Sequence, residues 1–522
     1  MHKSVPRGLL VLVSLLALAC RAPAAAQKEQ PRRSACGGKT VFALVDVNVI
    51  AMGTAHVWPH HTVAWCGDTI VDVAPRAELN LPPDTTILEA PGAYVMPGLA
   101  DMHTHLIRPQ DLTLYVTHGV TTVRNMWGAP VHLEWRRQIK AGTRVGPRIF
   151  TAGPIVDGPH PVHQGSLPLS NAAQAAAVVK FHQAQGYDFI KIYSGLEAEP
   201  FGALMEHANA AGIKVVGHIP RAVGLEAAVK AGLHGVEHQD GSLEFLQAED
   251  SPVKGKWDRA SRANKILHVD ESRIPALSAL LKNVQSCPTR VVKDGFGPSA
   301  LAREKLASPA ARYVPACERA IWEPTTDLPP EAAVAYQKQV DLEEKIIRAL
   351  RDTRAPLLAG TDTANPLVIP GYSVHEELAH LVRSGLTPFE ALYSATRAAS
   401  DAVGLLDQFG SIHPGGAADL VLLGGNPLEA IHQTRNILGV VVGGRHLDAQ
   451  ALTALGRTWP PHSPRRRRCL RSRRRGRSLL RGCLRPPTPF PGRMRPLEQN
   501  ASGWGRTTHS MHRPLTRTPG KQ

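Results

Sequence analysis

Residues 97–105 read PGLADMHTH, a short apolar run that ends in two histidines separated by one residue. In a β-strand, residues i and i+2 lie on the same face, so the side chains of His103 and His105 are expected to point the same way. Two neutral imidazoles within reach of one ion form half of a divalent metal site. The H-x-H pair alone is a modest signal, because two histidines in a loop are common.

The same arrangement, a short apolar run ended by a polar residue, recurs along the chain. His218, His238 and Asp362 each follow such a run. One histidine in this position is more often structural than a ligand. Four histidines and an aspartate at the ends of four strands would be unfavourable to bury unless a metal compensates for their lost hydration.

Between residues 97 and 405 short apolar runs alternate with helical patterns, which is typical of βα units and a parallel sheet. The expected strands are Leu99–His105, Val120–Asn125, Arg148–Ala152, Phe189–Tyr193, Val215–His218, Gly235–His238, Val284–Pro288 and Leu357–Asp362. Eight such repeats predict an α/β fold, a (β/α)8 barrel of the TIM type, whose chemistry lies at the carboxyl ends of the strands.

Strand patterns without long helices flank the barrel region on both sides. Residues 40–96 and residues 406–455 each hold short β-rich runs separated by Pro and Gly turns. We expect these two segments to pair into one small composite β-sandwich domain built from both chain ends.

Lys191 lies within YDFIKIY, residues 187–193, a strand whose neighbours are apolar. A lysine that faces the interior of a barrel is unfavourable unless it is paired or modified. If deprotonated, it could react with CO2 to form a carbamate, a carboxylate on a long arm that can bridge two cations. The alternative is a buried lysine ion-paired to Asp101 or Asp362. Tyr193 lies on the same face and could hydrogen-bond a substrate.

The net charge of +16 suggests a nucleic-acid-binding protein, but its location argues otherwise. Residues 460–522 contain 17 Lys and Arg and one acidic residue, Glu498, so the rest of the chain is electrically balanced. We therefore expect a disordered basic tail over residues 460–522 and no nucleic-acid binding by the main domain. An arm that binds nucleic acid or anionic lipid is the alternative for the tail.

The N-terminus has the order of an export signal. Lys3 and Arg7 precede an apolar run, Leu9–Ala19, and small residues follow at 24–26. We expect residues 1–26 to be a signal peptide and the protein to be exported to the periplasm or the medium, with lipid attachment at Cys20 as a second possibility. No later run approaches ~18 apolar residues, so no transmembrane span is expected.

An oxidising compartment would permit a disulfide between Cys36 and Cys66 or between Cys287 and Cys317. The sequence leaves this choice open. The chain has no C-x-x-C pair, so a zinc site built from thiolates is not expected.

Over about residues 40–455 the sequence resembles the amidohydrolase superfamily, and within it the imidazolonepropionase-related branch that includes binuclear zinc dipeptidases. The matching motifs are PGLxDxHxH at 97–105, GVTTVR at 119–124, KIY at 191–193, GH at 217–218, EH at 237–238, GTD at 360–362 and GSIxPGxxADL at 410–420. The chain departs from the family at residues 125–128, where NMWG replaces the Asp and glycine pair common in relatives.

The resemblance implies two divalent metal ions, with zinc preferred. It assigns His103, His105 and Asp362 to the buried metal, His218 and His238 to the outer metal, and a carboxylated Lys191 to the bridge between them. A hydroxide held by the metals would attack an amide-type C–N bond, as in a dipeptide or an N-acyl amino acid. Asp362 would take up a proton and pass it to the leaving nitrogen.

Substrate contacts are less well marked. Tyr193, Arg124, His163 and His375 follow barrel strands and are the candidates. An alternative enzyme is a mononuclear cyclic-amide hydrolase or deaminase with an unmodified Lys191. An alternative of another class is a non-catalytic binding protein on the same barrel. The partner is expected to be a small-molecule substrate, and the chain could form a homo-oligomer.

Overall fold

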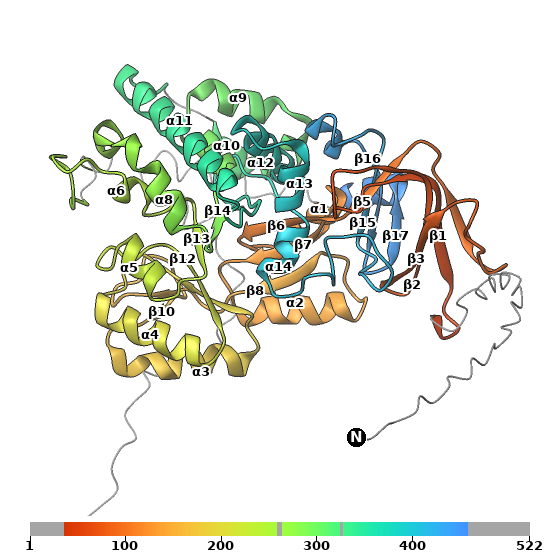
Figure 1. Ribbon diagram of the computed structural model, residues 1–522, viewed down its shortest axis with the longest axis horizontal. Coiled ribbons are helices and arrows are strands. Elements are labelled where there is room, and N and C mark those ends of the chain that lie inside the picture. The colour runs from red at the N-terminus through yellow and green to blue at the C-terminus, as the bar shows by residue number, and fades with distance from the viewer. Residues whose placement is uncertain (1–35, 258–260, 262–263, 324–326, 458–522) are drawn as a thin grey trace, which may run out of the picture.

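The computed structural model describes residues 36–257, 261, 264–323 and 327–457 (Figure 1). The expected signal peptide, Cys20 and the basic tail lie outside these residues. In the described part the chain forms a barrel of parallel strands with surrounding helices, and a mixed sheet that lies to one side of it. No helix of the described part is long and apolar enough to cross a membrane.

Seven barrel strands are regular and parallel. They are β6 (Leu99–Thr104), β7 (Val120–Asn125), β8 (Arg148–Thr151), β11 (Phe189–Ile192), β12 (Lys214–Gly217), β13 (Gly235–Glu237) and β14 (Gln285–Cys287). They form two hydrogen-bonded groups, β6-β7-β8 and β11-β12-β13-β14. A parallel bridge between Ala152 and Phe189 joins the groups, so the predicted strand order holds.

The eighth strand position is extended chain rather than a regular strand. Leu357 bridges Ser286 of β14, and Thr363 bridges Thr104 of β6, so this segment closes the barrel. The segment departs from ideal strand geometry because Asp362 has a φ of 55°. Gly360 is required by a close approach, since a Cβ there would lie 2.4 Å from the Cys287 Sγ atom.

Two short strands extend the barrel sheet after β8. They are β9 (Val156–Asp157), which pairs with β11 at Ile192, and β10 (Leu167–Pro168), which pairs with β9. The loop between them contains His163. This pairing places that loop beside the carboxyl end of β11.

Helices surround the barrel, and several of them turn an apolar side inward. They are α1 (Asp111–Thr117), α2 (Pro130–Lys140), α3 (Ala175–Gln185), α4 (Ala198–Ala210), α5 (Leu225–Lys230), α6 (Ser242–Phe245), α8 (Ile274–Leu280), α9 (Ser299–Ala307), α10 (Ala316–Trp322), α11 (Pro330–Asp352), α12 (Tyr372–Arg383), α13 (Pro388–Ser394) and α14 (Arg397–Ala402). In α11, Leu342, Ile346 and Leu350 are buried at a spacing of four residues, which is the spacing of one helix face. Two connections are long: the one after His238 contains α6 and α8, and the one after β14 contains α9, α10 and α11.

The mixed sheet is built from both chain ends, as the sequence predicts. Its order is β17-β16-β15-β5-β1-β2-β3, with β4 paired to β1. The bounds are β1 (Val41–Val49), β2 (Trp58–Cys66), β3 (Thr69–Pro75), β4 (Thr86–Glu89), β5 (Tyr94–Pro97), β15 (Leu420–Leu423), β16 (Ile437–Val442) and β17 (Arg445–Asp448). β5 joins the two halves, because it pairs in parallel with β1 and antiparallel with β15.

The composite domain is one sheet whose two ends meet, rather than two separate sheets. Thr69, at the start of β3, forms a bridge with Ala417, just before β15, and the Trp65 indole donates to the Gly444 carbonyl at 2.8 Å. Apolar side chains from both halves, among them Val47 and Val441, share one core. The final helix α15 (Ala449–Arg457) packs against α1 of the barrel.

One of the two disulfides that the sequence permits is formed. Cys36 is bonded to Cys66, with a Cα–Cα distance of 5.9 Å, and Cys287 is a free, buried thiol. The bond links the segment before β1 to the end of β2. Val41, the first residue of β1, pairs with Cys66, so the chain just before β1 lies close to that cysteine.

Candidate metal centre

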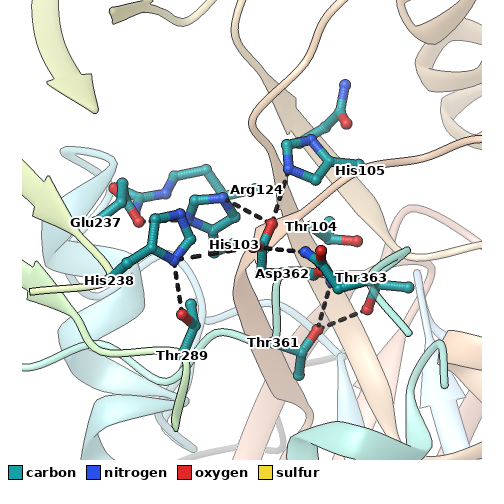
Figure 2. A network of polar contacts seen from close by, with 12 residues as sticks. His103, Thr104, His105, Arg124, Glu237, His238, Thr289, Thr361, Asp362 and Thr363 are labelled. Atoms are coloured by element: carbon teal, nitrogen blue, oxygen red, sulfur yellow. Dashed lines mark hydrogen bonds and ion pairs between the residues drawn. The ribbon is translucent and has the colours of Figure 1, made fainter. Parts of the chain in front are cut away.

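Side chains from five parts of the barrel converge at the carboxyl ends of the strands (Figure 2). The His103 ring lies 4.5 Å from the His238 ring, which in turn lies 4.8 Å from the His218 ring, centroid to centroid. The Asp362 Oδ1 atom lies 2.8 Å from His105 Nε2 and 3.3 Å from His103 Nε2. The four histidines and the aspartate singled out in the sequence are therefore neighbours.

The histidines differ in depth. The His103 side chain is 1% exposed, whereas His105, His218 and His238 are 18–19% exposed. The centre thus has a buried side, formed by His103, and a side that is open at the mouth of the barrel.

The backbone is held in an unusual conformation where these side chains leave the strands. His238 and Asp362 have φ angles of 61° and 55°, and Thr289, just after β14, has a φ of 50°. Non-glycine residues seldom adopt positive φ, and such residues cluster at functional sites, where surrounding structure enforces them. The strain here aims the side chains into the barrel mouth.

Three of the four histidines are oriented by a partner on the Nδ1 atom. His103 Nδ1 donates to the Glu237 carboxylate at 2.6 Å, and His218 Nδ1 donates to Asp240 at 3.2 Å. His238 Nδ1 bonds the Thr289 hydroxyl at 2.7 Å. A ring whose Nδ1 is engaged in this way is left with Nε2 as its free ligand atom, which is the usual arrangement around protein metal sites.

Arg124 supports this centre from inside the barrel and does not reach its mouth. Its guanidinium bonds Glu237 at 2.8 Å, the Met102 carbonyl at 2.6 Å and the Gln285 side chain at 3.1 Å. The side chain is buried with these partners. The expectation that Arg124 binds substrate is therefore wrong. The residue lies within β7, below the mouth of the barrel, and its guanidinium already forms an ion pair with Glu237.

Asp101 fixes the chain on either side of the centre. Its carboxylate accepts hydrogen bonds from the His103 and Thr361 backbone N–H groups at 3.2 and 3.0 Å, and from the Thr361 hydroxyl at 2.6 Å. Burial raises the pKa of Asp101 to about 6, although these hydrogen bonds oppose the shift. The residue holds β6 and the Asp362 segment in register.

Lys191 is buried at the centre, with 1% of its surface exposed. Among the described residues, its Nζ atom has no hydrogen-bond partner, and it forms no ion pair with Asp101 or Asp362. Burial lowers the pKa of Lys191, against the attraction of Glu237 and Asp362. A buried ammonium without a partner is unfavourable, so the site favours the neutral amine or a modified group.

The surroundings of Asp362 favour its ionised form. Burial would raise its pKa, but attraction to His238 and His103 and the contact with His105 Nε2 outweigh this effect and hold the pKa well below its usual value. Burial lowers the pKa values of His105, His218 and His238. The centre therefore presents a carboxylate and three imidazoles whose neutral form is favoured, as binding of a divalent cation requires. His103 differs: burial would lower its pKa, but attraction to Glu237 and Asp362 outweighs this effect and raises the pKa.

The donor set fits a divalent metal ion. One ligand atom from each of His103, His105 and Asp362 lies within 4.8 Å of the others. The Nε2 atom of His103 and the Nδ1 atom of His105 are buried without a hydrogen-bond partner in the described part. Nitrogen and carboxylate ligands suit zinc and other first-row ions.

A second group of potential ligands, His103, Glu237 and Cys287, does not fit a metal as well. His103 Nδ1 already donates a hydrogen bond to Glu237 Oε2. Burial raises the pKa of the Cys287 thiol well above its usual value, which opposes the thiolate that a metal needs.

Two of the proposed substrate contacts lie beside the centre. The Tyr193 ring is 4.3 Å from the His218 ring, and the His163 ring is 4.8 Å from Tyr193. Trp127, which the sequence did not single out, continues this row, 5.4 Å from His163 and 6.0 Å from His105. We call Trp127, His163 and Tyr193 the aromatic wall.

His375 lies elsewhere. It is buried on α12, where its Nε2 donates to the His118 carbonyl at 3.0 Å and its Nδ1 bonds Thr434 at 2.9 Å. The expectation that His375 approaches the substrate is wrong. The face of α12 that carries His375 packs against the end of α1 and against the composite domain, away from the metal centre.

Sequence reasoning missed the partners that orient the ligands. Glu237, Asp240 and Thr289 lie next to strand ends, and only Glu237 carries a visible signal, as an acid within the buried run GVE at 235–237. Asp240 and Thr289 lie in loops of ordinary polar composition and give no such signal.

Comparison with known proteins places the chain in a family. The model of the amidohydrolase family matches residues 94–447, which is most of the chain. The solved structure of bottromycin amidohydrolase is 30% identical with a TM-score of 0.66, covering 88% of this chain and 95% of that one. A Xaa-Pro dipeptidase with methionine bound in its active site is 20% identical with a TM-score of 0.57, covering 78% of this chain and 100% of that one; this likeness shows the fold.

A shorter match is to the adenine deaminase of Ruegeria pomeroyi, 37% identical over 79 residues, which is 14% of this chain and 13% of that relative. The match is confined to a small part of both proteins. Taken with the barrel, its ligand cluster and the matches that span most of the chain, the protein belongs to the amidohydrolase family and is a hydrolase that acts on carbon–nitrogen bonds.

Proposed function

We propose that this enzyme hydrolyses the amide bond of a dipeptide or an N-acyl amino acid with two divalent cations, zinc by preference, joined by a carbamate on Lys191. The observation that carries the proposal is the Lys191 Nζ atom, which is buried near the histidines and Asp362 and has no hydrogen-bond partner among the described residues. The amine has a lowered pKa, and an amine must be neutral to react with CO2. The resulting carboxylate would give this position a group able to bind two cations.

His103, His105 and Asp362 would hold the buried cation, His218 and His238 the outer one, and modified Lys191 both. When bound, divalent cations lower the pKa of water and polarise a carbonyl group. The engaged Nδ1 atoms of His103, His218 and His238 direct their other nitrogens to the centre, so little reorganisation is needed on binding.

Asp362 is the residue that moves the proton. Its Oδ2 atom accepts a hydrogen bond from the Asn365 side chain at 2.7 Å, which fixes the carboxylate plane. The Oδ1 atom then faces the histidines, where it can accept the proton of the attacking water and later give it to the leaving nitrogen. The pKa of Asp362, held well below its usual value, keeps this carboxylate ionised at neutral pH before the reaction.

The aromatic wall positions the substrate. Tyr193 contacts the ligand His218, and Trp127 contacts the ligand His105, so the wall lies beside both sides of the centre. It offers planar apolar surfaces, a phenol and an imidazole, which suit an amide flanked by apolar side chains. Dipeptides and N-acyl amino acids with an apolar residue on one side of the bond are the first compounds to test.

The test is release of free amine from a panel of dipeptides and N-acyl amino acids, measured with the full chain supplied with zinc and bicarbonate. We expect at least one compound to be hydrolysed, and Asp362→Asn to abolish that hydrolysis. Asp352→Asn, an exposed residue at the end of α11, is the matched control and should leave the rate unchanged. A panel that is hydrolysed equally by the Asp362→Asn enzyme would contradict the proposal.

A mononuclear cyclic-amide hydrolase or deaminase is the second candidate. Two observations favour it: His103, His105 and Asp362 alone bring three ligand atoms within 4.8 Å, enough for one ion, and a short segment matches an adenine deaminase. Hydrolysis of dihydropyrimidines or hydantoins, or release of ammonia from adenine, by an enzyme that contains one metal would favour this candidate over the first.

We also propose that the protein is exported. The order of charge, apolar run and small residues in 1–26 supports export, and so does the Cys36–Cys66 disulfide, because such bonds persist in oxidising compartments. Cell fractionation of the full chain should find the enzyme outside the cytoplasm, and Cys20→Ala should change its membrane association only if Cys20 carries a lipid. Recovery of the full-length, unprocessed chain from the cytoplasm would contradict export.

A further inference from the structure

A cavity of about 300 Å³ lies on the outside of the barrel, where it meets the composite domain. The end of α1, the start of α12, the helix α15 and two 3-10 segments, η6 (Pro309–Tyr313) and η7 (Ile431–Arg435), contribute to its walls. It is separate from the metal centre. His118 lies just before the start of β7, whereas the metal ligands follow the carboxyl ends of strands.

The cavity carries positive charge without a matching negative charge. Two arginines, Arg312 and Arg435, line it, and no acidic residue does. Within the described part of the chain, neither guanidinium lies within 4.0 Å of a carboxylate, whereas the buried Arg124 and Arg290 inside the barrel are each paired with a glutamate. Two guanidiniums that line one cavity attract an anion with more than one oxygen atom.

Aromatic rings lie beside both arginines in the lining. The Arg312 guanidinium lies 4.7 Å from the Tyr313 ring centre, and that of Arg435 lies 5.0 Å from the Tyr372 ring centre. The His118 ring meets both tyrosines edge to face, at 5.5 and 5.8 Å. Such rings offer stacking surfaces to a planar ligand.

His118 does not supply charge to this cavity. Its Nδ1 atom bonds the Leu114 carbonyl at 2.8 Å. Burial and, to a smaller extent, the charges of Arg312 and Arg435 lower the pKa of His118 to about 4, against the effect of this hydrogen bond. The ring is therefore neutral at pH 7, and the positive charge of the cavity belongs to the two arginines.

We propose that this cavity binds a small organic anion that carries a planar ring, with its carboxylate or phosphate group between Arg312 and Arg435 and its ring against Tyr313 and Tyr372. The volume is at the lower end of the range of small-molecule sites. Leu452 and Ile437 add apolar surface for the ring. Because its walls come from the barrel and from the composite domain, a ligand here stabilises the junction between them.

The test is isothermal titration calorimetry of the full chain with benzoate, phenyl phosphate and benzamide. We expect one molecule of benzoate or phenyl phosphate to bind per chain, and the tighter of the two identifies carboxylate or phosphate as the preferred group. Neutral benzamide, which has the same ring, should bind at least about tenfold more weakly, as expected when hydrogen bonds to a charged group are lost.

The double variant Arg312→Gln/Arg435→Gln distinguishes this cavity from the metal centre, which could also bind anions. Both arginines are exposed, so the variant should fold, and an unchanged melting temperature would verify this. Binding should weaken at least about tenfold in the double variant and remain unchanged in Arg137→Gln, an exposed arginine on α2. Equal affinity of the wild type and the double variant, or no binding by either anion, would overturn the proposal.

Discussion

The mouth of the barrel and the composite sheet are stabilised in opposite ways. At the mouth, buried titratable groups meet: Lys191 has no hydrogen-bond partner in the described part of the chain, Asp362 and His238 have positive φ angles, and Glu237 and Arg124 are paired in the interior. The composite sheet has an apolar core, regular pairing and a disulfide at one end. The barrel mouth holds reactive groups in place at the cost of stability. The composite sheet stabilises the fold and carries no reactive group of the metal centre. Substitutions in the two regions should therefore separate activity from stability.

The largest effect is expected for Lys191→Met, which replaces the buried amine with an apolar chain of similar size. Activity should fall by more than about a hundredfold, beyond the usual loss when an outer partner of a metal ligand is removed. The stability of the metal-free protein should stay the same or increase, because the variant removes a buried amine that has no hydrogen-bond partner in the described part of the chain. Steady-state rates and thermal melting measure both, and Lys180→Met, exposed on α3, is the control. A large loss of stability with retained activity would show that Lys191 stabilises the fold and is not needed for the reaction.

Glu237→Gln should reduce both activity and stability. The substitution weakens the bond that orients His103 and leaves Arg124 as an unmatched buried charge. We expect activity to fall about 10- to 100-fold and the free energy of unfolding to fall by about 3–5 kcal/mol. Glu226→Gln, exposed on α5, should change neither quantity. If chemical denaturation curves of Glu237→Gln and the wild type coincide, the interior pair does not support the centre.

In the composite sheet, Cys36→Ser/Cys66→Ser should affect stability alone. The disulfide closes a loop with a sequence separation of 30 residues. A loop of that length predicts a loss of about 3–4 kcal/mol in the free energy of unfolding, while kcat/KM stays at the wild-type value because the bond is remote from the metal centre. A fall in kcat/KM of the folded variant would show that the two regions are coupled.

A smaller effect, visible only as a pH dependence, is expected from Glu377 on α12. Its carboxylate accepts the backbone N–H groups of Arg290 and Val291, and burial raises its pKa from 4.5 to about 7. Because the folded state holds this proton more tightly than the unfolded state, stability should fall as pH rises from 4.5 through 7, by about 3 kcal/mol.

Glu377→Gln should flatten this part of the stability profile. The quantity to measure is the difference in unfolding free energy between wild type and variant at pH 5 and pH 8, with Glu226→Gln as the reference. A wild-type profile as flat as that of Glu377→Gln would mean that Glu377 is ionised in the folded protein throughout this range.

The sequence predicts the barrel strands and the convergence of the ligand residues because both depend on local patterns. A strand of four to six residues can be recognised by its apolar run. The residue that follows the strand lies at the barrel mouth, and this position does not depend on how the helices pack. Strand patterns in residues 40–96 and 406–455 likewise predict the composite domain, and the pairing of β5 with β15 confirms that the two segments meet.

Other features depend on distant contacts and could not be predicted. Arg124 and Glu237 lie on β7 and β13, and only the closed barrel brings them together. His375 was misplaced because the rotation of α12 about its axis is set by packing against α1 and η7. The choice of Cys36–Cys66 follows from the β1–β2 register, which places Cys66 opposite Val41.

The most direct test of a two-metal centre organised by Lys191 is the metal content of the folded protein, measured by elemental analysis after purification with bicarbonate. The protein should lack residues 1–26, and Lys191→Ala should be compared with the wild type. We predict two divalent ions per chain in the wild type and a clear loss of metal in Lys191→Ala. One ion per chain, unchanged by the substitution, would contradict the bridged centre and favour the mononuclear enzyme.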